Sequence, residues 1–167
     1  MWILCCSLAT NGQVLTLCGY TQPVIGGAFE EKTNAQANAG NETVSTATEV
    51  MRFYIFAEIK KGVAVSFTSV WIKGKPYHFK SNRIHTFPFV VSTAKAGEPA
   101  QADTLLIKTT GTVFQFINLT PHAEDYKNKP AAKLIASNDL VIFYTINRKR
   151  KMATLTHLKN ISPVFVQ

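Results

Sequence analysis

The body of the chain alternates short apolar runs with turn residues. Val50 to Lys60 is rich in β-branched and aromatic residues, and Lys61-Gly62 supplies a turn before the next run, Val63 to Ile72. These two runs are predicted to form a hairpin. The second run carries its large side chains at alternate positions and so on one face of a strand, at Val63, Val65, Phe67 and Trp71.

Similar runs continue to the end of the sequence, separated by turn signals at Lys73–Pro76, Ser81-Asn82 and Gly111. The predicted strands are Tyr77 to Lys80, Arg83 to Ser92, Thr104 to Thr109, Thr112 to Leu119, Lys133 to Ile135, Leu140 to Ile146 and Met152 to Leu158. The two runs that flank Gly111 are predicted to pair as a hairpin, with Phe114 and Phe116 on one face. The last two runs are joined by Asn147–Lys151, and the short ending Val164–Val166 fits a sheet edge.

Roughly eight short strands with no convincing helical periodicity predict an all-β fold. The architecture we expect is a single antiparallel β-sandwich, immunoglobulin-like or related. A small β-barrel is the alternative. There is no alternation of strand and helix to support a parallel sheet.

The length of 167 residues and an apolar content of 46% predict one domain with a real core, and they exclude disorder, collagen and coiled coil. Residues 13–49 are expected to supply an N-terminal strand and a polar loop. Residues 50–167 form the body of the same domain.

Residues 1–12 resemble a truncated signal peptide. Met1–Ala9 is uncharged and apolar, and the small residues Thr10 and Gly12 stand at the −3 and −1 positions for cleavage before Gln13. A signal peptide normally starts with a basic residue, whereas the first one here is Lys32, so a buried first strand is the alternative. The run is too short to span a bilayer as a helix, and no later segment is a transmembrane candidate.

The cysteine content does not argue against export. If Cys5 and Cys6 leave with the signal peptide, Cys18 is alone and the mature chain has no disulfide. Leu15–Cys18 is a poor lipobox because Leu17 is bulky, and Cys18 is better interpreted as a small buried apolar residue. We expect the protein to be exported to the periplasm, the cell surface or the medium of a bacterium, because its start and composition resemble small exported bacterial proteins.

Charge is the one compositional anomaly. The chain carries +8 overall, but residues 1–50 hold one Lys and four Glu, so the surplus of +11 lies after residue 50. Its sharpest concentration is the candidate polyanion-binding run Arg148, Lys149, Arg150 and Lys151. The alternative is a solvated hairpin tip whose charges keep sheet edges apart.

Other basic turns would enlarge this patch if they lie at the same end of the fold, namely Lys60, Lys61, Lys73 and Lys75. No nucleic-acid-binding motif is present, so specific nucleic-acid binding is not expected. Tyr54, Phe67 and Phe116 are better explained as core residues than as stacking platforms for bases.

The sequence contains no catalytic signature. The four histidines, His78, His85, His122 and His157, lack the tight spacing of a metal site, and nucleophile elbows and phosphate loops are missing. We therefore predict no catalytic residues, no metal and no cofactor. His78 and His85, seven residues apart, would lie on opposite faces of a continuous strand.

These observations favour an exported, non-catalytic binding module at the bacterial cell envelope or outside the cell. Its expected partner is an envelope protein or an anionic polysaccharide or lipid surface. The alternative is a small-ligand or lipid carrier with a barrel cavity, suggested by Leu140 to Ile146, which is apolar on both faces. An enzyme that uses His78, His85 or His122 is the least favoured interpretation.

Overall fold

The fold is nearly all strand, as expected. A computed structural model describes residues 15–26, 49–85, 89–93, 101–105, 110–123 and 129–166, and the predicted signal peptide lies outside them. Its elements are β1 (Leu15–Gly26), β2 (Glu49–Ile59), β3 (Val65–Ile72), β4 (Lys75–Ile84), β5 (Phe89–Thr93), β6 (Gln101–Leu105), β7 (Thr112–Pro121), α1 (Lys129–Ser137), β8 (Leu140–Ile146), β9 (Lys149–Leu155), β10 (Lys159–Asn160) and β11 (Val164–Val166).

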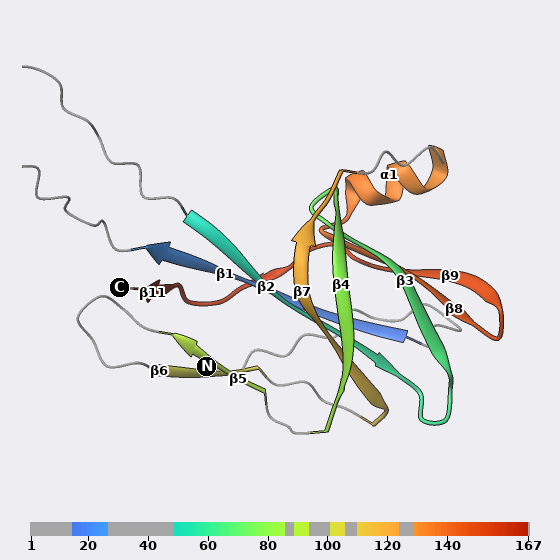
Figure 1. Cartoon of the computed structure of the whole chain (residues 1–167), viewed down its shortest axis with the longest axis horizontal. Helices are drawn as coiled ribbons and strands as arrows, with labels where there is room; N and C mark the ends of the chain where they lie inside the picture. Colours follow the sequence, from blue (N-terminus) through green and yellow to red (C-terminus); the bar gives the residue numbers. More distant parts are fainter. Residues whose placement is uncertain are drawn as a thin grey trace, which may run out of the picture.

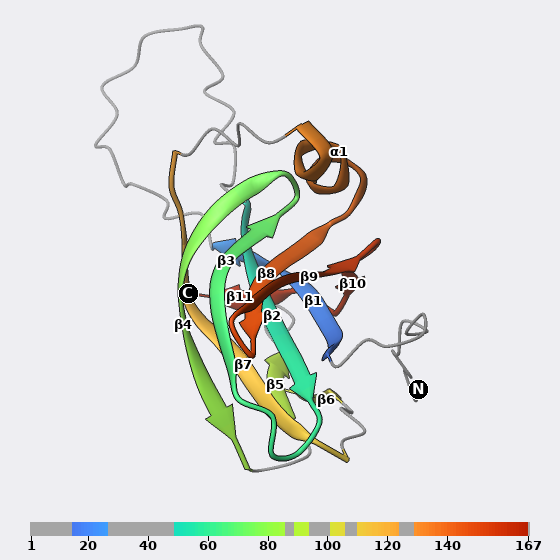
Figure 2. The same cartoon turned by 90° about the vertical axis from the view of Figure 1, so that its right-hand side faces the viewer.

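Most strands form one sheet that curls into a half-barrel (Figures 1 and 2). The strand order is β10-β1-β2-β7-β4-β3-β8-β9, and β11 also pairs with β1, while β5 and β6 form a separate two-stranded sheet. The curled sheet fits the barrel alternative, whereas the immunoglobulin-like sandwich is not confirmed.

The sheet is mixed rather than purely antiparallel. After β9 the chain turns back along β1 and pairs with it in parallel twice, at Tyr20↔Lys159 in β10 and at Val24↔Val164 in β11. The short ending therefore does sit at a sheet edge.

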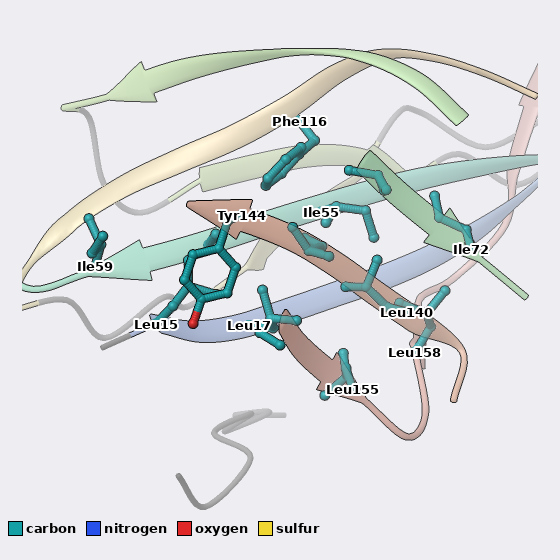
Figure 3. Packing of buried hydrophobic residues seen from close by; sticks show 14 of the residues in the cluster. Leu15, Leu17, Ile55, Ile59, Ile72, Phe116, Leu140, Tyr144, Leu155 and Leu158 are labelled. Carbon is teal, nitrogen blue, oxygen red and sulfur yellow. The ribbon is translucent and has the colours of Figure 1, made fainter. Parts of the chain in front are cut away.

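The main core fills the concave side of the half-barrel (Figure 3). Alternation places Leu15 and Leu17 of β1, Ile55 of β2, and Leu140 and Tyr144 of β8 on this side, each at most 2% exposed. The concave face of the described sheet is thus packed with apolar side chains.

The convex side is covered in two places. Over β1 and β2, Cys18, Tyr20 and Phe56 form a second buried cluster with Val91 of β5, and the rings of Phe56 and Phe89 lie 5.1 Å apart. This cover explains why β1 and β2 are apolar on both faces, and it confirms that Cys18 is buried.

Helix α1 supplies the second cover, and it corrects the predicted strand at Lys133–Ile135. Pro130 is favourable in a first helical turn and the following alanines are strong helix formers. Ala131 and Ile135, four residues apart, are buried, and Ile135 packs on Trp71 and Val141. The outer apolar face of β8 is therefore buried under α1, an explanation that needs no ligand.

A β-bulge in β3 reverses the face of its large side chains. Phe67 pairs with Tyr144 and Ser69 with Phe143, so Thr68 is an extra residue, and its hydroxyl donates to the carbonyl of Phe143 at 3.1 Å. Before the bulge Phe67 packs against the concave core, whereas after it Trp71 points to the convex side. The prediction that Phe67 and Trp71 share a face is wrong for this reason.

Two predicted hairpins are also wrong, because a strand has only two edges. Both edges of β2 are taken by β1 and β7, so β2 does not pair with β3. Both edges of β7 are taken by β2 and β4. Of its predicted partner Thr104–Thr109, the first two residues belong to β6, which pairs with β5, and residues 106–109 lie outside the described part of the chain.

The strand β4 runs on through Ser81-Asn82, where a break was predicted. It pairs with β3 only at Val70–Ile72, beside the turn at Lys73-Gly74, and the two strands then diverge (Figure 1). Phe67 packs edge-to-face on Phe116 across this divergence, with ring centroids 4.8 Å apart. Phe114 and Phe116 share the concave face, as predicted.

Candidate polyanion-binding surface

The basic run lies on the β8–β9 hairpin, but only its first residue is in the turn. Asn147 and Arg148 have φ angles of 50° and 64°, the positive values that a tight two-residue hairpin turn requires. The strand β9 starts at Lys149 and pairs with β8 at Lys149↔Ile146 and Lys151↔Tyr144. The sequence pattern predicts that the whole run lies in the connection between the two strands. In the structure Lys149, Arg150 and Lys151 instead belong to β9, at the edge of the sheet.

Strand geometry divides these charges between the two faces of β9. Lys149 and Lys151 share the concave face with Ala153 and Leu155, whereas Arg150 lies on the convex face. All the basic side chains of the run are exposed. Because β9 ends the strand order of the sheet, they line its rim from both sides.

A second basic segment reaches the same end of the fold. Lys60 and Lys61 form the exposed turn between β2 and β3, where the Val63 amide donates to the Lys60 carbonyl at 3.3 Å. The first residue of β3, Val65, pairs with Ile146, the last residue of β8. The turn at Lys60-Lys61 and the β8–β9 turn therefore lie at one end of the half-barrel (Figure 1), and we call the following residues the basic end: Lys60, Lys61, Arg148, Lys149, Arg150 and Lys151.

The other two basic turns do not join them. Lys73 and Lys75 connect β3 to β4 at the opposite end, where Ile72 pairs with Leu140 at the start of β8. The Lys73 amide donates to the Asp139 carbonyl at 2.8 Å, which fixes this turn beside the end of α1. The basic patch is therefore enlarged by one of the two candidate turns.

The acidic side chain described nearest to the basic end is that of Glu58, and it is held by backbone amides. The carboxylate of Glu58, near the end of β2, accepts hydrogen bonds from the amides of Thr110 and Gly111 at 2.7 and 2.8 Å. Asp139, the other acidic residue whose side chain is described, lies at the opposite end and accepts from the Leu158 amide at 2.9 Å. Among the described side chains, Glu58 is thus the only acidic group near the basic end, and its carboxylate is held by backbone amides.

The structure brings together two of the predicted histidines. The rings of His78 and His122 stack with centroids 4.1 Å apart and planes inclined by 23°. β4 is continuous and ends at Ile84, so His85 lies exposed just beyond it, and His157 is exposed after β9. No group of three or more His, Cys, Asp or Glu side chains that could hold a metal ion occurs in the described ranges.

Pairing of β4 with β7 creates this contact. Tyr77 lies opposite Pro121, and the amide of His122 donates to the carbonyl of Pro76 at 3.0 Å. The contact joins positions separated by a long stretch of sequence, and only the strand order reveals it.

In the part of the chain that is described, no helix is long and apolar enough to cross a membrane. No protein-family model, curated protein or solved structure matches this chain.

Proposed function

We propose that this protein is an exported, non-catalytic binding module whose basic end contacts anionic polymers or anionic lipid surfaces at the bacterial envelope. The observation that carries the proposal is the meeting of two basic segments, Lys60-Lys61 and Arg148–Lys151, which are far apart in the sequence. A lone charged hairpin tip serves solubility and edge protection equally well. Convergence of a second turn of the same charge favours a binding surface.

The form of the surface favours an extended partner. Its cations stand on a turn and along both faces of an edge strand, and each is exposed to water. Such an arrangement spreads positive potential over an open surface instead of enclosing it in a pocket. It therefore suits a partner chain or a surface that carries repeated negative charges. Phe116 is 1% exposed in the core, which supports a partner recognised by charge rather than by base stacking.

The test measures binding of the full chain to dextran sulfate and to vesicles that contain phosphatidylglycerol. If all six cations contact phosphate-like groups, the slope of log affinity against log salt approaches about −5, using about 0.9 per contact as measured for DNA. Lys60→Gln with Lys61→Gln should weaken binding to the preferred probe and reduce this slope by about 2. Neutralising Arg148 and Lys149 should have a similar effect.

The matched control is Lys75→Gln with Lys133→Gln, which removes the same charge from exposed positions at the opposite end. This control should bind as the wild type does, apart from a small loss due to net charge. Equal losses in both pairs would show that only net charge matters and would refute a localised site. Failure of the wild-type chain to bind either probe at low salt would refute the proposal itself.

A further inference from the structure

The stacked histidines lie outside the basic end and have a chemistry of their own. His78 is exposed on β4 and His122 is half-buried just after β7. Two imidazoles with ring centroids 4.1 Å apart are a pair of the commonest metal-ligating side chains, one on β4 and the other just beyond the end of the neighbouring strand β7.

The backbone keeps the pair in place. Tyr77↔Pro121 and His78↔Thr120 are in register, and the His122 amide is bonded to the Pro76 carbonyl. Tyr77 points to the concave core, so His78 projects from the convex face, on the same side as Trp71, which lies directly opposite Pro76. His78 is thus fixed by the strand β4, and His122, one residue beyond β7, is tied to the same strand through its amide.

We propose that His78 and His122 form a two-histidine site for a divalent transition-metal ion, with the remaining coordination positions filled by water. Two nitrogens bound to one ion at about 2.0–2.1 Å lie roughly 3 Å from each other. The ring centroids of His78 and His122 lie 4.1 Å apart, so the two side chains are close enough for one ion to reach a nitrogen of each after a change of rotamer. In the stacked arrangement the nitrogen lone pairs lie in nearly parallel planes, so metal binding requires the exposed His78 side chain to change its rotamer.

The two imidazole ligands also determine which metal ions the site prefers. Neutral imidazole suits Cu²⁺, Ni²⁺ and Zn²⁺, and affinity at such a site follows the order in which Cu²⁺ binds most tightly. Lys80, two positions along β4 on the same face, is exposed, and its positive charge opposes the bound ion. Because each imidazole must be neutral to bind, acid should release the metal.

The experiment uses the full chain without a histidine tag and with Cys5→Ser and Cys6→Ser, so that thiolates of the amino terminus do not compete. Ni²⁺ is titrated by calorimetry, and sub-stoichiometric Cu²⁺ is added while the histidine ring protons are followed by NMR. We expect one Ni²⁺ per chain, with the ring signals of His78 and His122 broadened before those of His85 and His157. Removing a residue that only hydrogen-bonds to a metal ligand costs about tenfold to a hundredfold in affinity. His78→Ala and His122→Ala each remove a ligand itself, so each should weaken Ni²⁺ binding at least about tenfold.

The controls separate this site from general affinity of surface histidines. His85→Ala and His157→Ala should leave the Ni²⁺ affinity unchanged, and Lys80→Gln should increase it. The proposal is overturned if His78→Ala and His122→Ala bind Ni²⁺ as tightly as the parent, or if all four ring signals broaden together. Both variants replace residues that are not in the core. Circular dichroism spectra of the variants check that the sheet is intact, and we expect them to match the spectrum of the parent.

Discussion

At Gly111 the backbone of the neighbouring strand leaves no room for a side chain. A Cβ atom built there would collide with the carbonyl oxygen of Ile59 and lie 3.0 Å from its carbonyl carbon. At Gly19 the nearest atom is instead the end of the Leu158 side chain, which can move. The two glycines therefore differ in how much a methyl group costs.

We expect Gly111→Ala to destabilise the fold by about 1–3 kcal/mol, because a backbone carbonyl cannot shift without breaking the pairing of β2 with β7. Gly19→Ala should cost less, since Leu158 can adopt another rotamer. Urea unfolding of both variants checks this order. Equal midpoints would show that β2 yields as readily as a leucine side chain.

Two tyrosines, the buried Tyr144 and the half-buried Tyr77, make the stability of the fold sensitive to alkali. Burial raises the pKa of Tyr144 and of Tyr77 above the ordinary value of 10.0, because the charged phenolate is poorly solvated there. In the unfolded chain these hydroxyls ionise first. Their contribution is therefore complete below pH 10 and is lost as the pH rises through the folded-state pKa.

The free energy of unfolding should accordingly fall as the pH rises above 10, and Tyr144→Phe should make that fall shallower. Urea titrations at pH 8, 10 and 11 measure it, and the value at pH 8 serves as the internal reference for lost packing. A parallel pH dependence in the variant and the wild type would contradict this role of Tyr144.

At the scale of elements, the bulge in β3 and the helix α1 depend on each other. The extra residue Thr68 turns Trp71 to the convex face, where Ile135 of α1 covers it. The carboxyl end of the helix is held by Asn138, whose side-chain amide donates to the Leu134 carbonyl at 2.8 Å. Without the bulge in β3, the Trp71 side chain would lie on the concave face and α1 would not pack against it.

Ile135→Ala should loosen α1 and cost about 2 kcal/mol or more, because it removes a largely buried side chain. In a Trp2→Phe background the emission of Trp71 should shift to longer wavelength as water gains access. Ala136→Ser, on the exposed face of the same helix, is the control and should leave the emission unchanged. An unshifted spectrum for Ile135→Ala would mean that the helix does not shield Trp71.

Local patterns identified most strands but not their partners. Val50–Lys60 and Leu140–Ile146 correspond closely to β2 and β8, because β-branched runs between turns are a local property. Which strands pair with each other, and along which edge, is not determined by neighbouring residues in the sequence. The predicted hairpins of β2 with β3 and of β6 with β7 failed at this step, whereas β8 and β9 do pair through their two-residue turn.

At the scale of the whole molecule, strand order decides which charges add together. Lys60-Lys61 and Arg148–Lys151 meet because β3 pairs with β8, and Lys73 and Lys75 are separated from them by the length of β3. If the basic end binds one extended anion, neutralising either segment should weaken the contact made by the other. The composition shows only that positive charge is in excess, whereas the strand order gathers part of that charge at one end of the fold.

The sequence alone determined that this protein consists almost wholly of strands, that its positive charge lies after residue 50, that Cys18 is buried, and that Arg148–Lys151 is its densest charge. Periodicity, apolarity and charge are properties of neighbouring residues, so they can be read from the chain. The half-barrel, the reversed face at Trp71, the union of two basic turns and the contact of His78 with His122 were decided only by the tertiary structure. Each depends on pairing between distant segments, and that pairing is set by the sum of many weak contacts rather than by any local pattern.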